Sequence, residues 1–172
     1  VSLMSPGQGS LGMEKITQLM QTYRDVEVPV IAAVSGPAAG IGCSLALMAD
    51  YVLMSENSYL MLAFTRIGLM PDGGATALVA ASAGRHRALR MALTAEKLPA
   101  TSALEWGLAS EVVAPDLLET RASEIAATFA NSATVALGRT KRAINDATLT
   151  ELDAALDREA TGQDLSLIHI SD

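Results

Sequence analysis

The sequence predicts an α/β protein in which a parallel-sheet core is followed by a helical region. Half of its 172 residues are apolar and 18% are charged, so the chain can bury a sizeable core. Up to residue 113, short apolar runs alternate with amphipathic stretches, a pattern typical of strands covered by helices. From residue 117 onward, apolar residues recur only at helical spacing.

The first part of the chain predicts a helix, a strand and a second helix. Residues 1–12 have the composition of a loop, whereas apolar side chains in residues 13–26 recur at three- and four-residue steps. Residues 28–34 form an apolar, β-branched run, as expected of a strand buried on both faces of a parallel sheet. A helix then runs from near Gly40 to Met48.

The remaining elements follow from the same patterns. We expect, in order, strands at 51–54 and 59–62 around a turn at 55–58, a glycine-rich bend at 68–74, helices at 75–83 and 85–93, a short helix at 102–106, a strand at 111–113, and helices at 117–130, 134–147 and 150–161. The last seven residues, 166–172, resemble translated sequencing adapter. We therefore expect a non-native tail and leave His169 out of the functional interpretation.

The composition excludes several classes of protein. A net charge of −7 argues against a nucleic-acid partner or an anionic membrane surface, because no basic stripe is available to replace phosphate counterions. The single cysteine, Cys43, excludes an intrachain disulfide framework, and the two histidines are too few for a Cys/His zinc cluster. We expect no metal and a reducing, cytoplasmic location.

One uncharged stretch, residues 28–49, is long enough to span a bilayer. Pro29, the 35–37 break, Gly40 and Gly42 would interrupt a lipid-exposed helix and leave backbone groups unpaired. The stretch is better interpreted as a buried strand, a tight turn and a buried helix, with no membrane partner.

The glycine-rich segment 36–42 is the most informative motif. A dinucleotide-binding fingerprint would need glycine where Leu45 stands, and a phosphate loop would need Gly-Lys-Ser/Thr, which is absent. Two interpretations remain: a turn whose free N–H groups and helix dipole hold negative charge, or glycines that allow close packing of strand and helix.

Three further residues, Cys43, Ser44 and Asp72, could carry chemistry. Cys43 and Ser44 lack the second glycine of a nucleophile elbow, and His86 is the only candidate base, so buried packing is favoured over nucleophilic catalysis. Asp72 lies in a glycine turn after the apolar Leu69 and Met70. It is either a desolvated base with a raised pKa or a cap of the helix that begins near Gly74.

The residues at 30–36, 40–43 and 46–50 resemble the enoyl-CoA hydratase/isomerase (crotonase) superfamily, and the similarity continues through 64–74, 88–94 and 103–109. The resemblance covers residues 13–163. It implies a crotonase-like ββα spiral whose partial core, residues 1–113, lacks the N-terminal strands of a typical member. It also implies a helical oligomerisation region at 114–165, and a homotrimer or hexamer for the full-length protein.

The chemistry that this resemblance implies is stabilisation of a thioester enolate by two backbone N–H groups. Ile41 matches one donor, between Gly40 and Gly42 of the substrate-binding turn, and the other comes from an earlier segment that this chain lacks. The substrate is an acyl-CoA thioester, so coenzyme A is part of the substrate and no separate cofactor is expected. Without the second donor, we expect the fragment to be inactive.

The acid residues indicate which reaction of the superfamily to expect. Ser44 and Phe64 stand where hydratases carry two glutamates, whereas Asp72 matches the catalytic aspartate of several isomerases. We therefore expect Asp72 to shift the double bond of a 3-enoyl-CoA to the 2-position, with Ser44, Phe64, Leu69 and Met70 lining the site. A hydratase with other acids and a non-catalytic acyl-CoA-binding homologue remain the alternatives.

Overall fold

The computed structural model describes the backbone of residues 6–170 and the side chains of residues 12–166. Its strands are β1 (Ile31–Val34), β2 (Pro37–Ala39), β3 (Tyr51–Ser55), β4 (Tyr59–Met61), β5 (Leu98–Pro99) and β6 (Glu111–Val113). Its helices are α1 (Pro6–Asp25), α2 (Ile41–Met48), α3 (Ala75–Ala83), α4 (Arg85–Thr94), α5 (Ala100–Glu105), α6 (Leu118–Ala130), α7 (Thr134–Thr148) and α8 (Leu152–Ile170), with 3-10 turns η1 (Ala63–Ile67) and η2 (Pro115–Leu117).

The strands form two three-stranded sheets, ordered β1-β3-β6 and β2-β4-β5. Strand β1 pairs in parallel with β3, and β2 pairs in parallel with β4, so each strand of the second repeat lies beside its counterpart in the first. The consecutive strands β1 and β2 are followed by α2, and the consecutive strands β3 and β4 are followed by η1 and α3. This repeat is the predicted ββα spiral, here with two successive turns.

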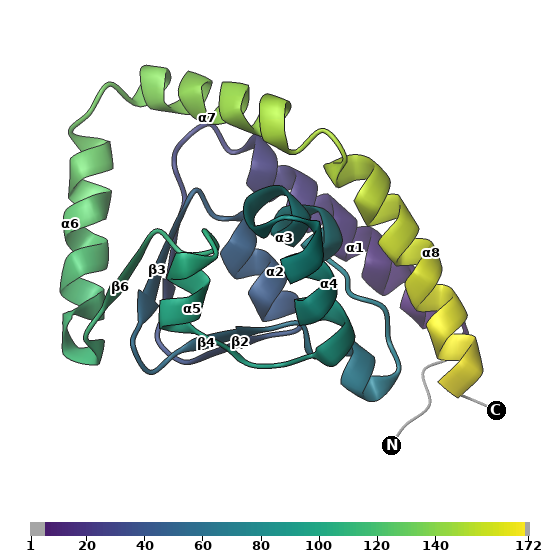
Figure 1. Ribbon diagram of the computed structural model, residues 1–172. Coiled ribbons are helices and arrows are strands. Elements are labelled where there is room, and N and C mark those ends of the chain that lie inside the picture. The colour runs from purple at the N-terminus through teal and green to yellow at the C-terminus, as the bar shows by residue number, and fades with distance from the viewer. Residues whose placement is uncertain (1–5, 171–172) are drawn as a thin grey trace.

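Helices cover both sheets (Figure 1). The largest apolar cluster fills the space between the strands and helices α2 to α5, and includes Met54, Leu60, Val79 and Met91. Helix α6 packs on the outer face of the β1-β3-β6 sheet through Leu118 and Ile125. Helix α8 lies alongside α1, and together they bury Met20, Leu152 and Leu156 against Leu78 of α3.

Most predicted elements are confirmed, and the differences have simple causes. Residues 37–39 form strand β2 instead of part of a turn, because three residues are too few to show an alternating pattern. Strand β1 is shorter than expected, and its Ala33 is exposed, so the strand is not buried on both faces. Helix α1 begins at Pro6, where a loop was expected, since proline is tolerated in a first helical turn. Residues 1–5 lie outside the described part.

The last helix also differs from expectation. Helix α8 continues to Ile170, past the end expected near residue 161 and into the segment that we interpret as a non-native tail. The side chains from residue 167 onward, including that of His169, lie outside the described ones. Among the described residues, no helix combines the length and apolar character needed to cross a bilayer.

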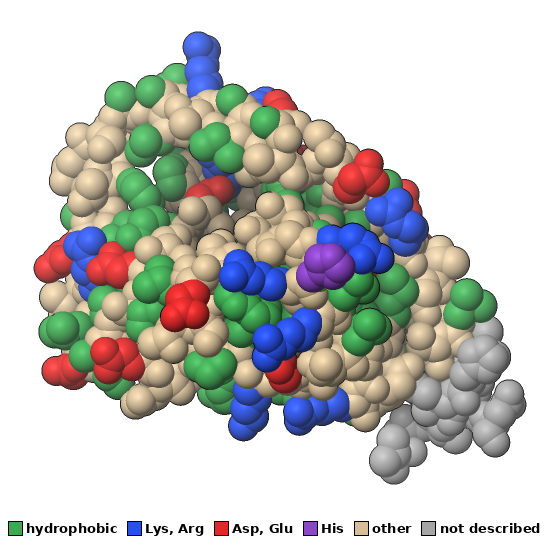
Figure 2. Space-filling model, in the orientation of Figure 1, with side chains coloured by type: hydrophobic (Ala, Val, Ile, Leu, Met, Phe, Trp, Pro, Cys, Tyr) green, Lys and Arg blue, Asp and Glu red, His purple; other side chains and the backbone are tan. Residues whose placement is uncertain are grey.

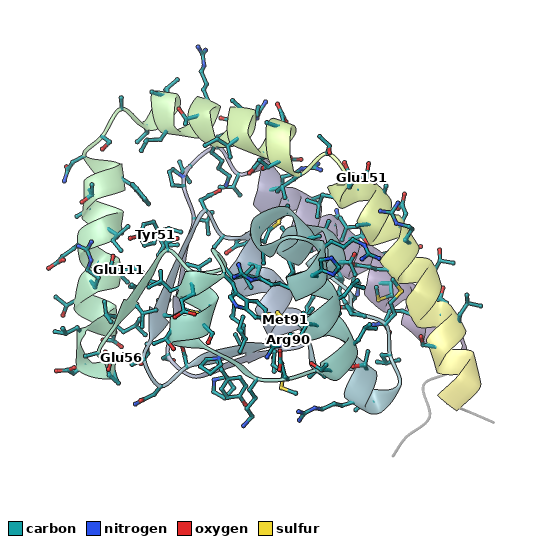
Figure 3. The ribbon with its side chains drawn as sticks, viewed as in Figure 1. Tyr51, Glu56, Arg90, Met91, Glu111 and Glu151 are labelled. Carbon is teal, nitrogen blue, oxygen red and sulfur yellow. The ribbon has the colours of Figure 1, made fainter. Side chains whose placement is uncertain are left out.

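Ion pairs and hydrogen bonds of charged side chains attach helix α7 and strand β6 to the rest of the fold. Lys141 of α7 is buried: its Nζ lies 2.8 Å from Asp50 Oδ2, and the same oxygen accepts a 2.8 Å bond from Val30 N. Helix α7 therefore crosses the start of β1 at close range. On the other side, Tyr51 of β3 donates to Glu111 of β6 across 2.8 Å (Figure 3).

Basic side chains gather over α4 in a chain that is otherwise acidic (Figure 2). The guanidinium carbons of Arg87 and Arg90 lie 5.2 and 5.5 Å from the centre of the Trp106 ring. This contact is within range of a cation–π interaction, so the indole helps to hold the two arginines side by side.

Candidate active site

The site begins at the turn between β2 and α2. Gly40 has φ +57°, a conformation that suits glycine, and its N–H donates to the Met61 carbonyl of β4 across 3.0 Å. The Gly40 carbonyl accepts the first bond of the helix, from Cys43 N at 2.9 Å. Ile41 is the first residue of α2, so its N–H has no acceptor within the helix and lies at the positive end of the helix dipole.

A second turn, residues 68–74, lies against this helix start. The Ser44 hydroxyl donates to the Asp72 carbonyl across 2.7 Å. Gly73 has φ +66°, and a Cβ there would lie 2.6 Å from Ile41 Cδ1 and 2.9 Å from Ser44 Cβ. Only glycine fits both the conformation and the space at position 73. This glycine therefore allows the backbone next to Asp72 to approach the beginning of α2.

The Asp72 carboxylate is 7% exposed and its two oxygens differ. Oδ2 accepts a 3.3 Å bond from Gln163 Nε2, whereas Oδ1 is buried and has no hydrogen-bond partner among the described residues. Burial raises the pKa of Asp72 from its ordinary value of 3.8 to about 6, and the negative charge of Glu159 adds to the rise. A carboxyl group with this pKa can both take up and release a proton near neutral pH.

Two residues of α8 contact this turn. Glu159, 0% exposed, accepts bonds from Gly74 N at 2.6 Å, Thr76 N at 2.9 Å and Thr76 Oγ1 at 2.6 Å. Gln163 donates to the Met70 carbonyl at 2.5 Å as well as to Asp72. The sequence analysis missed both. They could have been noticed in the sequence because they share a helical face with the apolar Leu152, Ala155 and Leu156, where a polar side chain is unusual.

Comparison with known proteins identifies the fold that carries this arrangement. The family model for enoyl-CoA hydratase/isomerase matches residues 5–166. The chain belongs to the enoyl-CoA hydratase/isomerase family. It is 42% identical over 148 residues to 1,2-epoxyphenylacetyl-CoA isomerase of Escherichia coli K12, a match that covers 86% of this chain and 56% of that protein. It is 41% identical to a probable enoyl-CoA hydratase of Rhodobacter capsulatus, again over 86% of this chain and 57% of the relative.

The solved structures agree with this assignment. A crystal structure of an enoyl-CoA hydratase from Mycobacterium avium subsp. paratuberculosis K-10 superposes with a TM-score of 0.89 at 52% identity, and the match covers 90% of this chain and 63% of that chain. The predicted crotonase-like fold is therefore confirmed. The chain spans little more than half the length of these two curated relatives.

The two positions that resemble the glutamates of family hydratases hold no acid. Ser44 is fully buried, and its hydroxyl is used by the Asp72 carbonyl. Phe64 is 6% exposed, and its ring lies 3.9 Å from where a Cβ of Gly40 would be. Of the expected lining residues, Leu69 is half-buried and its N–H donates to the Phe64 carbonyl across 3.0 Å, whereas the side chain of the half-buried Met70 lies against Gly162 of α8.

Other candidate residues lie apart from Asp72. Cys43 is fully buried and burial raises the pKa of its thiol to about 12, which opposes a nucleophilic role, and His86 is exposed on α4. Gly42 lines a separate cavity of about 440 Å³ with Ala38, Leu45 and Ala46. The structure thus gathers Gly40, Ile41, Ser44, Phe64 and Asp72, but places Gly42 on another side of α2.

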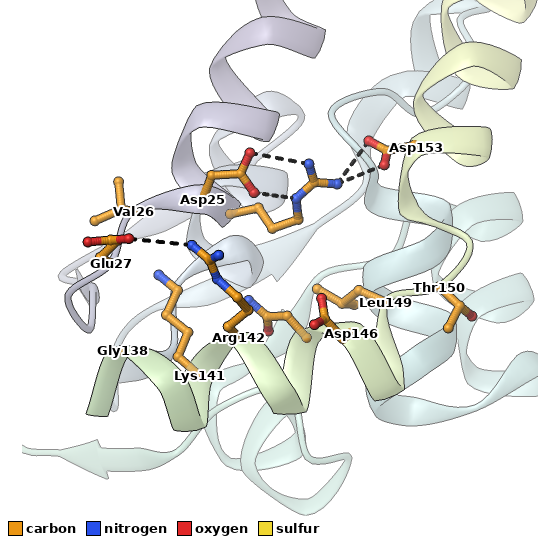
Figure 4. A pocket seen from close by; sticks show the side chains of 12 residues that line it. Asp25, Val26, Glu27, Gly138, Lys141, Arg142, Asp146, Leu149, Thr150 and Asp153 are labelled. Carbon is orange, nitrogen blue, oxygen red and sulfur yellow. Dashed lines mark hydrogen bonds and ion pairs between the residues drawn. The ribbon is translucent and has the colours of Figure 1, made fainter. Parts of the chain in front are cut away.

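A larger cavity, of about 650 Å³, lies between α1, α7 and α8 (Figure 4). Arg24 is held there between two carboxylates, with 2.8 Å to Asp25 and 2.9 Å to Asp153, and Arg142 lies 3.6 Å from Glu27. Arg24 and Arg142 are thus paired with carboxylates of the lining, Lys141 pairs with Asp50 outside it, and Asp72 does not border the cavity. It is a gap between outer helices, not part of the site.

Proposed function

We propose that the protein containing this chain is an enoyl-CoA isomerase that moves the double bond of a 3-enoyl-CoA to the 2-position. The observation that carries the proposal is Asp72: its carboxylate is buried with one oxygen that has no hydrogen-bond partner among the described residues, and its backbone carbonyl is bonded to Ser44 near the start of α2. Almost all buried polar atoms in proteins are hydrogen-bonded, so a buried oxygen without a partner is a candidate for proton transfer.

In the proposed reaction one carboxylate serves two carbons. Asp72 takes a proton from C2 of the 3-enoyl thioester, which breaks a C–H bond and leaves a dienolate. The same carboxyl group returns the proton to C4, so the double bond between C3 and C4 becomes one between C2 and C3. A pKa of about 6 suits both steps, because the protonated and ionised forms of Asp72 differ little in free energy near neutral pH.

The negative charge of the dienolate develops on the thioester oxygen. The Ile41 N–H, at the first position of α2, is the donor that this chain supplies to the proposed oxyanion hole. The family resemblance assigns the second donor to a segment that precedes these residues. We therefore expect the 172-residue chain alone to be inactive.

Water must be excluded if hydration is not to compete. Leu69 is half-buried in the turn that carries Asp72, Phe64 is buried beside Gly40, Met70 lies against Gly162 of α8, and the Ser44 hydroxyl is occupied by the Asp72 carbonyl. Hydratases of this family use two glutamates, and neither Ser44 nor Phe64 can transfer a proton to or from water. Hydration is the second candidate reaction, because one relative, from R. capsulatus, is named a probable enoyl-CoA hydratase.

The experiment follows the absorbance of the conjugated enoyl thioester in the protein expressed with any residues that precede and follow this chain in its gene. With 3-enoyl-CoA we expect absorbance to rise, and the Asp72→Asn variant to lose the activity. Because the carboxylate form must take up the first proton, the rate should increase as pH rises through about 6. A fall in absorbance with 2-enoyl-CoA would mean hydration, and binding of acyl-CoA without either change would mean a non-catalytic homologue.

The remaining properties follow from the same proposal. Residues 114–165 would form the oligomerisation region of a homotrimer or hexamer, as the resemblance implies, and residues 1–113 part of the catalytic core. Coenzyme A enters as part of the substrate, so no metal or separate cofactor is required for the proposed steps. We place the protein in the cytoplasm, in keeping with its single buried cysteine.

A further inference from the structure

Helix α8 reaches the Asp72 turn with two polar side chains one helical turn apart. Glu159 and Gln163 are both buried, and both of their polar ends contact residues 70–76, more than 80 positions earlier in the chain. Neither contact is needed to attach α8, because Leu152 and Leu156 already bury apolar surface against α1 and α3. Two buried polar groups on an apolar face call for a specific role.

Gln163 holds Asp72 from one side only. Its single amide nitrogen donates to the Met70 carbonyl at 2.5 Å and to Asp72 Oδ2 at 3.3 Å. The carboxyl group is thereby fixed relative to the backbone of its own turn. Since Oδ2 accepts a bond and Oδ1 has no partner in the described part of the chain, the two oxygens are no longer equivalent.

Glu159 holds the backbone on the other side of Asp72. Its carboxylate accepts three bonds, from Gly74 N, Thr76 N and the Thr76 hydroxyl, and so takes up free N–H groups at the beginning of α3. Gly74 has φ +76°, and Leu152 of α8 occupies the space that a Cβ there would need. With its oxygens occupied in this way, Glu159 is not free to exchange protons with a substrate.

We propose that Glu159 and Gln163 are positioning residues for Asp72: Glu159 fixes the turn, and Gln163 binds Oδ2, so that Oδ1 is the single oxygen that takes the proton from the substrate and returns it. The proposal rests on the isomerase function described above. It makes the docking of α8 a condition for the correct geometry of the base.

The charges around Asp72 give the proposal a distinct signature. Of the elements packed against it, α8 contributes the carboxylate of Glu159, whereas α2 contributes the uncharged Ile41 and Ser44, and the turn itself contributes Leu69 and Met70. The Gln163 donor favours the ionised form of Asp72, and the Glu159 charge disfavours it. Removing one or the other should therefore move the titration of Asp72 in opposite directions.

The experiment titrates the Asp72 carboxyl carbon by NMR in protein labelled with ¹³C-aspartate, with the signal assigned by its loss in Asp72→Asn. Gln163→Met keeps the length of the side chain and removes the donor, so the titration midpoint should rise by about half to one pH unit. Glu159→Gln keeps the shape and removes the charge, so the midpoint should fall. Thr161→Val, an exposed change on the same helix, should leave it in place.

Turnover is measured on the same proteins. If Gln163 positions the base, Gln163→Met should lower kcat by about 10-fold to 100-fold while KM changes by less than about 2-fold. The positioning role would be overturned if the Asp72 midpoint were unchanged in folded Gln163→Met and Glu159→Gln. It would also be overturned if Gln163→Met lowered kcat no more than the control Thr161→Val does. If Asp72→Asn retains activity, the proposed function fails instead, and the titration still decides whether α8 controls the carboxyl group.

Discussion

Replacing Asp72 by asparagine should change how the stability of the protein depends on pH. A carboxylic acid whose pKa is raised by folding binds more protons in the folded state than in the unfolded state over the pH range between its two pKa values. Folding is therefore opposed by Asp72 increasingly as pH rises from about 4 to above 6, and asparagine, which does not titrate, lacks this effect.

The magnitude follows from the two pKa values. A pKa of about 6 in the folded protein against 3.8 in the unfolded chain corresponds to about 3 kcal/mol in full, at about 1.36 kcal/mol per pH unit. Between pH 4 and pH 7.5, integration gives a loss of about 2.5 kcal/mol for the wild-type protein relative to the variant. The cost of burying an asparagine amide is independent of pH, and the titration of Glu159 is common to both proteins, so neither alters this difference to first order.

Urea unfolding of both proteins at pH 4 and pH 7.5 measures the effect, with equal m-values required so that the same surface is exposed in each. Asp157→Asn, which changes an exposed acid on α8, is the matched control, and its effect should stay within about 0.5 kcal/mol at both pH values. If the stability difference between wild type and Asp72→Asn is the same at the two pH values, the carboxylate is not desolvated by folding. The argument for Asp72 as a base of raised pKa would then be refuted.

Two further substitutions test the packing around the site. Gly73→Ala should cost about 2 to 4 kcal/mol in thermal or urea unfolding, because its φ of +66° and the side chains at the start of α2 both oppose a Cβ, whereas Gly36→Ala, with open space around it, should cost less than about 1 kcal/mol. Lys141→Met should cost about 2 to 3 kcal/mol by leaving Asp50 without its cation, while Arg142→Met on the exposed neighbouring position should change stability by less than about 0.5 kcal/mol. Equal effects within either pair would contradict the burial that the structure assigns.

The elements that the sequence predicts well are those with a clear local pattern. Helices α2, α3 and α4 and strand β6 lie where apolar spacing and glycine breaks placed them. Strand β5 has only two residues and its partner is β4, nearly forty positions earlier, so no local pattern reveals it. The burial of Lys141 cannot be predicted from local pattern for a related reason: it depends on the approach of α7 to Asp50, which is a long-range contact.

The residues of the candidate site also separate into those that local sequence predicts and those that only the fold reveals. The start of α2 and the glycine turn at 68–74 could be found from residue types, and the resemblance singled out Asp72 within that turn. Its neighbours on α8 could not, because the contacts of Glu159 and Gln163 with the turn join positions 83 to 93 residues apart. A charged residue on an apolar face signals that a partner exists, but the identity of that partner comes only from the fold.

The difference between the two buried acids supports the proposal that Asp72 is the group that transfers the proton. Burial raises the pKa of both carboxyl groups, but Glu159 accepts three hydrogen bonds that favour its ionised form and occupy its oxygens, whereas Asp72 accepts one bond of 3.3 Å and keeps one oxygen that has no partner among the described residues. A group so fully bonded is suited to holding backbone in place, and a group left partly unbonded is suited to exchanging a proton. The assignment would reverse only if Glu159 lost its bonds to the start of α3, which would also release the turn that carries Asp72. Base and support are therefore distinguished by their partners and not by their burial, which is nearly the same.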